Sequence, residues 1–201
     1  QHGLGHEAFK CLEKMQEEGL SPDQVTFICI LKVCGSIRDI NKGEEIHNEI
    51  LNRNLLTQTR NVVLGNALVD MYAKCGALGK AKQLLEALQF RNLVTWNTLI
   101  AGYAQQDHGK DALDSFDSMQ RDGFFPNDVT FTCILKACGS TGDIDKGKEI
   151  HQEIVGKGLL KKNVLLGTAL VDMYAKCGML AKADEVLKAL PFRDTVCWSA
   201  L

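Results

Sequence analysis

The string Ala67-Leu-Val-Asp-Met-Tyr-Ala-Lys-Cys-Gly76 occurs a second time, without a change, at residues 169–178. Outward from it, Gly43-Glu-Glu-Ile-His-Asn-Glu-Ile50 returns as Gly147-Lys-Glu-Ile-His-Gln-Glu-Ile154. The similarity continues further toward the N-terminus, and the two copies differ by a two-residue insertion near residues 56–60. A large internal repeat is typical of a stacked array, in which no single unit buries its apolar face alone.

The apolar residues inside each copy follow helical spacing. Ala81, Leu84, Leu85 and Leu88, for example, fall at i, i+3, i+4 and i+7, which places them on one face of a helix. Helix breakers separate these stretches: we expect Gly76, Gly109 and Gly178 in the turns between paired helices, and Pro22 and Pro126 after a second helix. The sequence therefore predicts an all-α fold, a right-handed superhelical α-solenoid of helix–turn–helix repeats with about eleven helices and no sheet.

The expected units alternate in length along one solenoid that spans residues 1–201. A partial unit at 1–23 is followed by units at 24–61, 62–92, 93–127, 128–163 and 164–194, and by the start of another at 195–201. Their order is long, short, standard, long, short. Tetratricopeptide repeats keep a length of about 34 residues and do not produce this alternation.

Composition excludes several classes of protein. With 201 residues, 45% hydrophobic, three prolines and 6% aromatics, the chain can bury a substantial core and is unlike a disordered protein. No apolar run approaches the roughly 18–20 residues of a membrane span, so we expect no membrane partner. The net charge of −2 denies the chain the strong basic field of a nonspecific nucleic-acid binder. Any nucleic-acid contact must depend on local placement of groups.

Neither the cysteines nor the histidines predict a metal or a catalytic site. The eight cysteines include no C-x-x-C, and six of them recur with the repeat, which favours packed, reduced thiols. His47-Asn-Glu49 and His151-Gln-Glu153 match half of a zinc deaminase motif, but its P-C-x-x-C half is absent and both histidines lie on an apolar stripe. We expect no catalytic residue, no metal and no other cofactor, and hence no enzyme. The chain begins without Met, so a deaminase-type domain or a targeting peptide could lie outside this piece.

Three motifs resemble a known family. Leu93-Val-Thr-Trp-Asn-Thr-Leu-Ile-Ala-Gly-Tyr-Ala104, the two Val-Asp-Met-Tyr-Ala-Lys-Cys-Gly strings and Gly-Lys-Glu-Ile-His are similar to plant pentatricopeptide repeat proteins of the PLS subclass. The resemblance implies sequence-specific binding of single-stranded RNA, one base per repeat, in a plastid or mitochondrion. It also implies a role in C-to-U editing or other processing of organellar RNA. An accessory editing factor, in place of RNA, is the alternative partner for the long units, whose polar pair is irregular at Ile28.

Two rows of short polar residues recur with the unit. The residue at the fifth place of each unit interrupts the apolar start of the first helix, and the last residue of each unit is Asn or Asp. Their donor and acceptor patterns differ, as discrimination among base edges requires. The candidate base-reading residues are Asp23, Asn66, Asn92, Asn97, Asn127, Thr132, Asn163, Thr168, Asp194 and Ser199. In the first long unit, Ile28 takes the fifth place and Asn61 the last.

An aliphatic residue holds the second place of each unit. In the family that the chain resembles, this place packs against bases; ordinary helix packing is the alternative. The members of this aliphatic row are Val25, Val63, Val94, Val129, Leu165 and Val196. Lys74 and Lys176 hold the place at which the family often contacts phosphate, although a lysine at a helix C-terminus also suits the helix dipole.

Other interpretations of the same residues remain open. Asn and Asp before a helix are favoured N-caps, so the last-residue row predicts helix capping as well as base recognition. A protein-interaction scaffold that holds a peptide, as tetratricopeptide arrays do, is the alternative function. By the family's pairing rules, the four units from residue 62 to residue 194 are expected to bind pyrimidine, pyrimidine, adenine and guanine, with the RNA 5′ end near the N-terminus.

Overall fold

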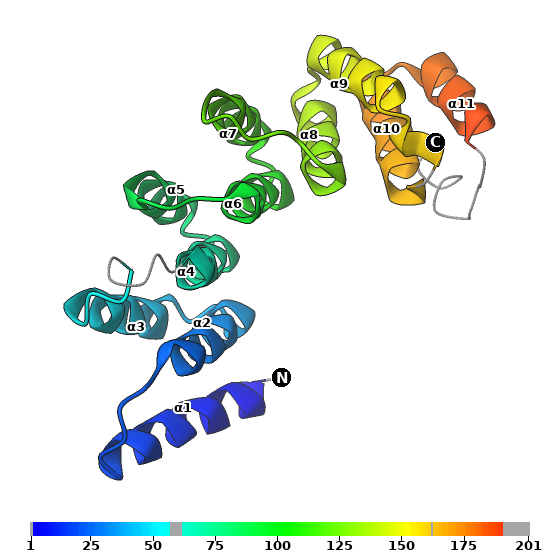
Figure 1. Ribbon diagram of the computed structural model, residues 1–201. Coiled ribbons are helices and arrows are strands. Elements are labelled where there is room, and N and C mark those ends of the chain that lie inside the picture. Colours follow the sequence, from blue (N-terminus) through cyan, green and yellow to red (C-terminus); the bar gives the residue numbers. More distant parts are fainter. Residues whose placement is uncertain (1, 57–61, 162, 191–201) are drawn as a thin grey trace. The chain divides into compact units, whose positions relative to one another are not determined.

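A computed structural model describes residues 2–56, 62–161 and 163–190 (Figure 1). This part of the chain forms eleven α-helices and one 3₁₀ turn, and it contains no strand. The all-α prediction is therefore confirmed. The elements are α1 (His2–Glu17), α2 (Gln24–Ile37), α3 (Ile40–Asn52), α4 (Val62–Lys74), α5 (Leu78–Ala87), α6 (Leu93–Gln105), α7 (Gly109–Arg121), α8 (Asp128–Thr141), α9 (Ile144–Gly156), η1 (Leu159–Lys161), α10 (Val164–Lys176) and α11 (Leu180–Ala189).

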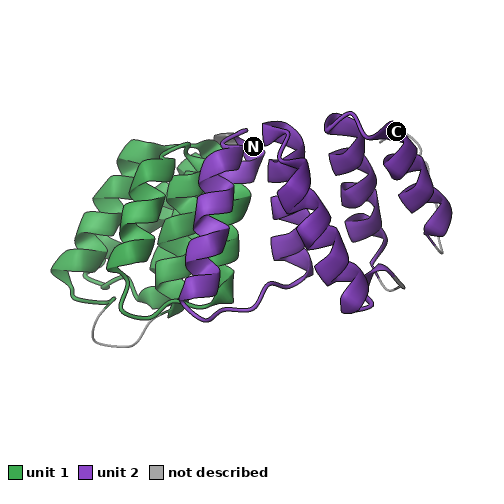
Figure 2. Ribbon diagram, turned by 90° about the horizontal axis from the view of Figure 1, so that it is seen from above, with its two compact units in different colours: residues 1–102 green, residues 103–201 purple. Residues whose placement is uncertain are grey.

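The chain divides into two compact parts, residues 1–102 and residues 103–201, and the boundary falls inside α6 (Figure 2). We call these parts the first unit and the second unit, whereas the long, short and standard units are the repeats expected from the sequence. In the first unit α2 packs against its own partner α3 and also against α4, which in turn packs against α5. In Figure 1, α2 and α4 accordingly lie along one side of this unit and α3 and α5 along the other. First helices thus form one layer and second helices form the layer behind it.

The second unit repeats this arrangement with its own helices. Helix α8 packs against α7, α9 and α10, and α10 packs against α11. The stacked first helices are α8 and α10. The second unit therefore carries a long–short pair of repeats, α8 to α11, that corresponds to α2 to α5 in the first unit.

The core of each pair is built by apolar residues one helical turn apart on the first helices. Phe27, Leu31 and Cys34 on α2 are fully buried, and Phe131, Leu135 and Cys138 on α8 are their counterparts. Burying each such side chain contributes on the order of 1.5–3 kcal/mol. The i, i+4, i+7 spacing places these three side chains on one face of the helix, so residues on the opposite face do not take part in this core.

Glycine permits close approach between a second helix and the following first helix. A Cβ at Gly43 would overlap the thioether of Met71, and one at Gly147 would lie 2.6 Å from the sulfur of Met173. Both glycines are buried and are the fourth residue of their second helix. The absent side chain is therefore a requirement of packing.

One expectation about the turns was wrong. Gly76 and Gly178 do lie in turns between paired helices, each with positive φ. Gly109, however, is the first residue of α7, and the left-handed residue of that turn is Asp107, at φ 60°. Asp tolerates this conformation because its short side chain bonds locally. Gly109 serves close packing instead, since a Cβ there would lie 2.6 Å from Ser140 Oγ.

No helix in the described part of the chain is long and apolar enough to cross a membrane.

Candidate nucleic-acid interface

The two polar rows meet at the N-termini of the first helices. Helices α2, α4, α6, α8 and α10 begin at residues 24, 62, 93, 128 and 164, each the first residue of an expected unit. The last residue of a unit therefore stands immediately before a first helix, and the fifth residue stands one turn into it.

Helix capping is present at every described last residue. Asp23 accepts a hydrogen bond from Thr26 N, Asn92 from Thr95 N, Asn127 from Thr130 N and Asn163 from Leu166 N. At Asp23 the Thr26 backbone N–H, together with its hydroxyl, lowers the pKa of the carboxyl group. Capping turns each amide so that its oxygen faces the helix, which leaves the NH₂ group of an Asn as the outward donor.

In the first unit, Asn66 and Asn92 are joined by a third residue that the sequence did not mark. The Thr95 hydroxyl lies 2.5 Å from Asn66 Oδ1 and 3.0 Å from Asn92 Oδ1. Asn66 Nδ2 lies 3.4 Å from Asn92 Oδ1. Thr95 is fully buried, so this network holds both amides in place. Asn66 and Asn92 were both candidate base-reading residues from the sequence, and they lie within hydrogen-bonding distance of each other, whereas Thr95 was not a candidate.

In the second unit, Asn163 has a different partner. Its Nδ2 donates to Asp128 Oδ2 at 2.9 Å, while its Oδ1 accepts from Leu166 N at 3.1 Å. Leu166 takes the place that Thr95 holds after Asn92, and it has no hydroxyl to offer. Thr132, the fifth residue of this repeat, bonds to the carbonyl of Asp128 at 2.8 Å. Thr168 makes the equivalent bond to Val164 O at 3.1 Å.

The structure describes the other candidate base-reading residues in less detail. Asn97 is 9% exposed, Asn127 forms a capping box with Thr130, and Ile28 is half-buried. Asn61, Asp194 and Ser199, together with Val196 of the aliphatic row, lie outside the described residues. The roles of all these residues stay predictions.

The aliphatic row is exposed. The exposed fractions are 65% for Val25, 60% for Val63, 56% for Val94, 53% for Val129 and 74% for Leu165. Two places further along their helices, Phe27, Trp96 and Phe131 are at most 5% exposed. Gly65 and Gly167 take this place on α4 and α10, and both are buried. Ordinary helix packing would bury these aliphatic residues, and they are not buried. Repeated, solvent-facing branched aliphatic residues of this kind are often covered by a ligand, and their role in packing against bases stays a prediction.

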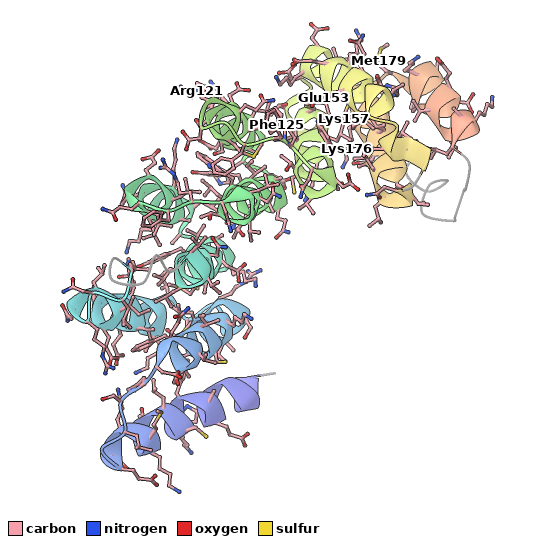
Figure 3. All side chains as sticks on the ribbon, viewed as in Figure 1. Arg121, Phe125, Glu153, Lys157, Lys176 and Met179 are labelled. Carbon is pink, nitrogen blue, oxygen red and sulfur yellow. The ribbon has the colours of Figure 1, made fainter. Side chains whose placement is uncertain are left out.

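Lys74 and Lys176 each pair with an acid one turn earlier on the same helix. Lys74 Nζ lies 2.7 Å from Asp70 Oδ2, and Lys176 Nζ lies 2.7 Å from Asp172 Oδ2. Their aliphatic stems pass over Gly35 and Gly139, which have no side chain to obstruct them. Figure 3 labels Lys176 on α10. Both lysine side chains remain about half exposed and able to meet a phosphate, although the paired aspartate offsets part of each charge.

The recurring histidines contact tyrosines. His47 Nδ1 lies 2.8 Å from the Tyr72 hydroxyl, and His151 Nδ1 lies 2.9 Å from that of Tyr174. Burial lowers the pKa of both histidines. Within the described residues no group of three or more His, Cys, Asp or Glu side chains could hold a metal ion. These histidines pack between helices, as their place on an apolar stripe indicated.

The thiols show no activation. The seven cysteines in the described ranges are free, and burial raises the pKa of Cys34 and of Cys138 to about 12. Cys75 Sγ lies 3.7 Å from the carbonyl of Cys34, and Cys177 Sγ lies 3.7 Å from that of Cys138; in each case the partner is the buried cysteine of the preceding repeat. A nucleophilic cysteine requires the opposite shift, toward the thiolate.

Family models match most of this chain. A model described as PPR repeat family matches residues 91–140, and one described as pentatricopeptide repeat domain matches residues 1–37. A model of the single PPR repeat matches residues 66–93, 129–159 and 168–192.

Curated relatives cover the chain almost from end to end. It is 36% identical over 199 residues to a chloroplastic pentatricopeptide repeat-containing protein of Arabidopsis thaliana, covering 99% of this chain and 32% of that protein. It is 33% identical over 195 residues to a mitochondrial one from the same plant, covering 97% of this chain and 34% of the relative. The chain thus spans about a third of the length of these relatives.

Solved structures share the fold. The crystal structure of the pentatricopeptide repeat protein PPR10 in complex with an 18-nt psaJ RNA element matches with a TM-score of 0.77 at 20% identity, covering 98% of this chain and 29% of that one. The nuclear proteinaceous RNase P 2 of A. thaliana matches with a TM-score of 0.58 at 15% identity, covering 75% of this chain and 34% of that one. The helical-repeat solenoid expected from the sequence is confirmed.

Proposed function

The chain belongs to the pentatricopeptide repeat family, and from that premise we propose that it binds single-stranded RNA sequence-specifically, one base per repeat. One observation carries the proposal: the aliphatic row is exposed beside a polar row whose side chains are held in fixed orientations. Flat apolar faces of bases would cover the aliphatic residues, and base edges would meet the polar ones. The RNA complex reported for PPR10 supports the same use of the fold.

The units are proposed to follow the long, short and standard classes of the PLS subclass, with the boundaries given above. On the family's rules, Asn66 with Asn92 and Asn97 with Asn127 select pyrimidines, Thr132 with Asn163 selects adenine, and Thr168 with Asp194 selects guanine. An ionised Asp offers only acceptors, which suits the two N–H donors on the guanine edge. The expected core is pyrimidine-pyrimidine-A-G, with its 5′ end toward the N-terminus.

The biological setting is proposed from relatives. Several carry chloroplastic or mitochondrial in their names, which supports a role for this chain in an organelle. We propose that it specifies sites for C-to-U editing or other RNA processing there. The chain supplies recognition, and any chemistry would come from another domain or protein.

A second candidate, a surface for an accessory protein, is supported by a separate observation. Leu51 on α3 and Val155 on α9 hold equivalent places in the two long units, and both are about half exposed. They lie on second helices, away from the residues proposed to read bases. Such a surface is compatible with RNA binding and does not replace it.

The test is a binding titration by fluorescence anisotropy at near-physiological salt. The probes are a labelled single-stranded RNA with the core C-C-A-G, the same length with the core scrambled, and the first sequence as a duplex. We expect tight binding to the first RNA, a loss of roughly tenfold or more on scrambling, and weak binding of the duplex. Equal binding of all three would overturn the proposal.

A variant of the aliphatic row adds a control for folding. Val63→Ser and Val129→Ser together remove apolar cover for the bases while leaving the buried core unchanged. We expect weaker RNA binding with an unchanged thermal unfolding curve. If RNA affinity stays the same, base packing by this row is wrong.

A further inference from the structure

The long unit of the second half holds an acidic side chain at its base-reading edge that the two polar rows do not include. Asp128 is the first residue of α8, and its Oδ2 accepts the hydrogen bond from Asn163 Nδ2 at 2.9 Å. Asp128 and Asn163 are 35 residues apart in sequence and both half-buried. The contact therefore joins the first and the last residue of one repeat.

This contact changes what Asn163 can offer. A side-chain amide has two N–H donors and one acceptor oxygen. The oxygen of Asn163 is turned to Leu166 N, and one N–H is taken by Asp128. One N–H remains for a base. Beside it stands Asp128 Oδ1, for which no partner is found within the described residues. The edge thus presents one donor next to one charged acceptor.

Asn92 in the first unit makes a different presentation. Its oxygen accepts from Thr95 N, from the Thr95 hydroxyl and, at longer range, from Asn66 Nδ2. The first residue of its repeat is Val62, which has no polar group. Both repeats thus end in Asn, but the two side chains have different partners. The oxygen of Asn92 accepts from a hydroxyl and an amide, whereas the NH₂ group of Asn163 donates to a carboxylate.

We propose that Asp128 is a third base-selecting residue of the unit at 128–163, favouring a base with an exocyclic amine and rejecting uracil. The inference rests on the proposed function, since it concerns the same RNA-binding edge. Adenine presents an amine donor next to a ring-nitrogen acceptor, which complements an acceptor next to a donor. Uracil presents carbonyl oxygens in place of the amine, and a carboxylate repels them.

The experiment removes one atom group from each side of the proposed contact. The protein is the full chain, wild type or Asp128→Asn, and the probe is single-stranded RNA with the core C-C-N-G. N is adenine, uracil or unsubstituted purine, which is adenine without its amine. For wild type we expect adenine to bind about tenfold more tightly than either of the others. For Asp128→Asn we expect that advantage to shrink to about twofold or less.

A charge-matched control is Asp145→Asn. Asp145 lies on α9 in the same repeat, is almost fully exposed and pairs only weakly with Lys148 at 3.6 Å. Asp145→Asn removes the same charge at a residue that does not contact Asn163. The ratio of its affinities for the adenine and purine RNAs should therefore equal that of wild type. Thermal unfolding of each variant establishes that it is folded at the binding temperature.

The outcomes separate the inference from the function on which it rests. If Asp128→Asn weakens all three RNAs equally, or leaves the adenine-to-purine ratio unchanged, Asp128 only supports the helix end and the inference is overturned. In both of those cases wild type still binds single-stranded RNA and the proposed function stands. If wild type binds no single-stranded RNA, the proposed function itself fails.

Discussion

The long–short pair α2 to α5 and its counterpart α8 to α11 share their interior and differ at their edge. In both pairs a methionine of the short unit fills the space over a glycine of the long unit, and a histidine bonds to a tyrosine. In both, a lysine crosses a second glycine and pairs with an aspartate. The contacts between repeats are therefore a fixed part of the design.

The polar residues at the helix N-termini are the variable part. The fifth place holds Ile28 in one long unit and Thr132 in the other, and Asn66 in one short unit and Thr168 in the other. The neighbours that orient the last residue also differ, Thr95 at Asn92 and Asp128 at Asn163. Packing demands a repeated solution, whereas recognition of different bases demands different side chains. This contrast is what the proposed recognition of bases requires, and it is visible without reference to any relative.

The largest effect should come from the shared interior. Phe27→Ala and Phe131→Ala each remove a fully buried ring, so each should lower the free energy of unfolding by about 3–5 kcal/mol. The two losses should be equal, because each ring also lies under a cation, Arg53 or Lys157. Figure 3 labels Lys157 with its partner Glu153 on α9. Urea unfolding measures both.

Val25→Ala and Val129→Ala are the matched controls. These residues stand two places before the phenylalanines but are more than half exposed, so each change should stay within about 0.5 kcal/mol. A large loss at either valine would mean that the aliphatic row belongs to the core.

The next effect concerns the hydrogen-bond network that joins Thr95 to Asn66 and Asn92. Thr95→Val keeps the shape of a buried side chain but leaves Asn66 and Asn92 without its hydroxyl. We expect a loss of about 1–3 kcal/mol in the free energy of unfolding, together with reduced base discrimination at that repeat. Thr98→Val, which removes only a bond to its own helix at Val94 O, is the control and should change little.

A smaller effect distinguishes the turns after α2 and α8. Arg38 and Gly142 both take the left-handed conformation, with φ of 58° and 74°. Because a Cβ is unfavourable there, Arg38→Gly should raise the free energy of unfolding by about 1 kcal/mol and Gly142→Arg should lower it by a similar amount. Arg38→Ala removes the long side chain but keeps the Cβ, so it should give no such gain. A gain from Arg38→Ala as large as that from Arg38→Gly would contradict the assignment.

The smallest effect should be a pH dependence shared by both pairs. The pKa of His47 is lowered by burial, and that of His151 by burial and then by Lys182. Below about pH 6.5 the unfolded chain binds protons that the folded chain resists, so stability falls as pH drops toward the lowered values. His47→Gln and His151→Gln should each flatten this fall in thermal unfolding measured from pH 7 to pH 5. Lys182 lowers the pKa of His151 and is not among the groups that shift the pKa of His47. Lys182→Gln should therefore weaken the pH dependence that His151 contributes and leave that of His47 unchanged.

Much of the fold was predictable because packing is periodic. The apolar spacing predicted the helices, and the expected first residues of five repeats coincide with the first residues of α2, α4, α6, α8 and α10. The exposed state of the aliphatic row was open from sequence, because Val at a helix start suits either packing or a ligand. The exposed fractions of these residues in the structure show that they are not buried by helix packing.

The contacts that orient the reading residues could not be predicted in the same way. Thr95 gives a local signal, since a hydroxyl three places after Asn92 indicates a capping box, but its bond to Asn66 joins residues 29 apart in sequence. Asp128 gives no signal, because an acid at the first helical position is ordinary. The Gly109 error has a similar cause: glycine predicts both turns and close contacts, and only the neighbours Ser140 and Thr141 distinguish them.

Gly43 receives the sulfur and methyl group of Met71, and Gly147 receives those of Met173, with the same atoms in contact. The seam between a long and a short repeat is consequently interchangeable between the two copies. A genetic crossover within the identical strings at 67–76 and 169–178 joins surfaces that already fit. Its product gains or loses a whole block of repeats while the seam between a long and a short repeat keeps its contacts. Under the proposed reading of one base per repeat, the bound sequence would lengthen or shorten by whole nucleotides.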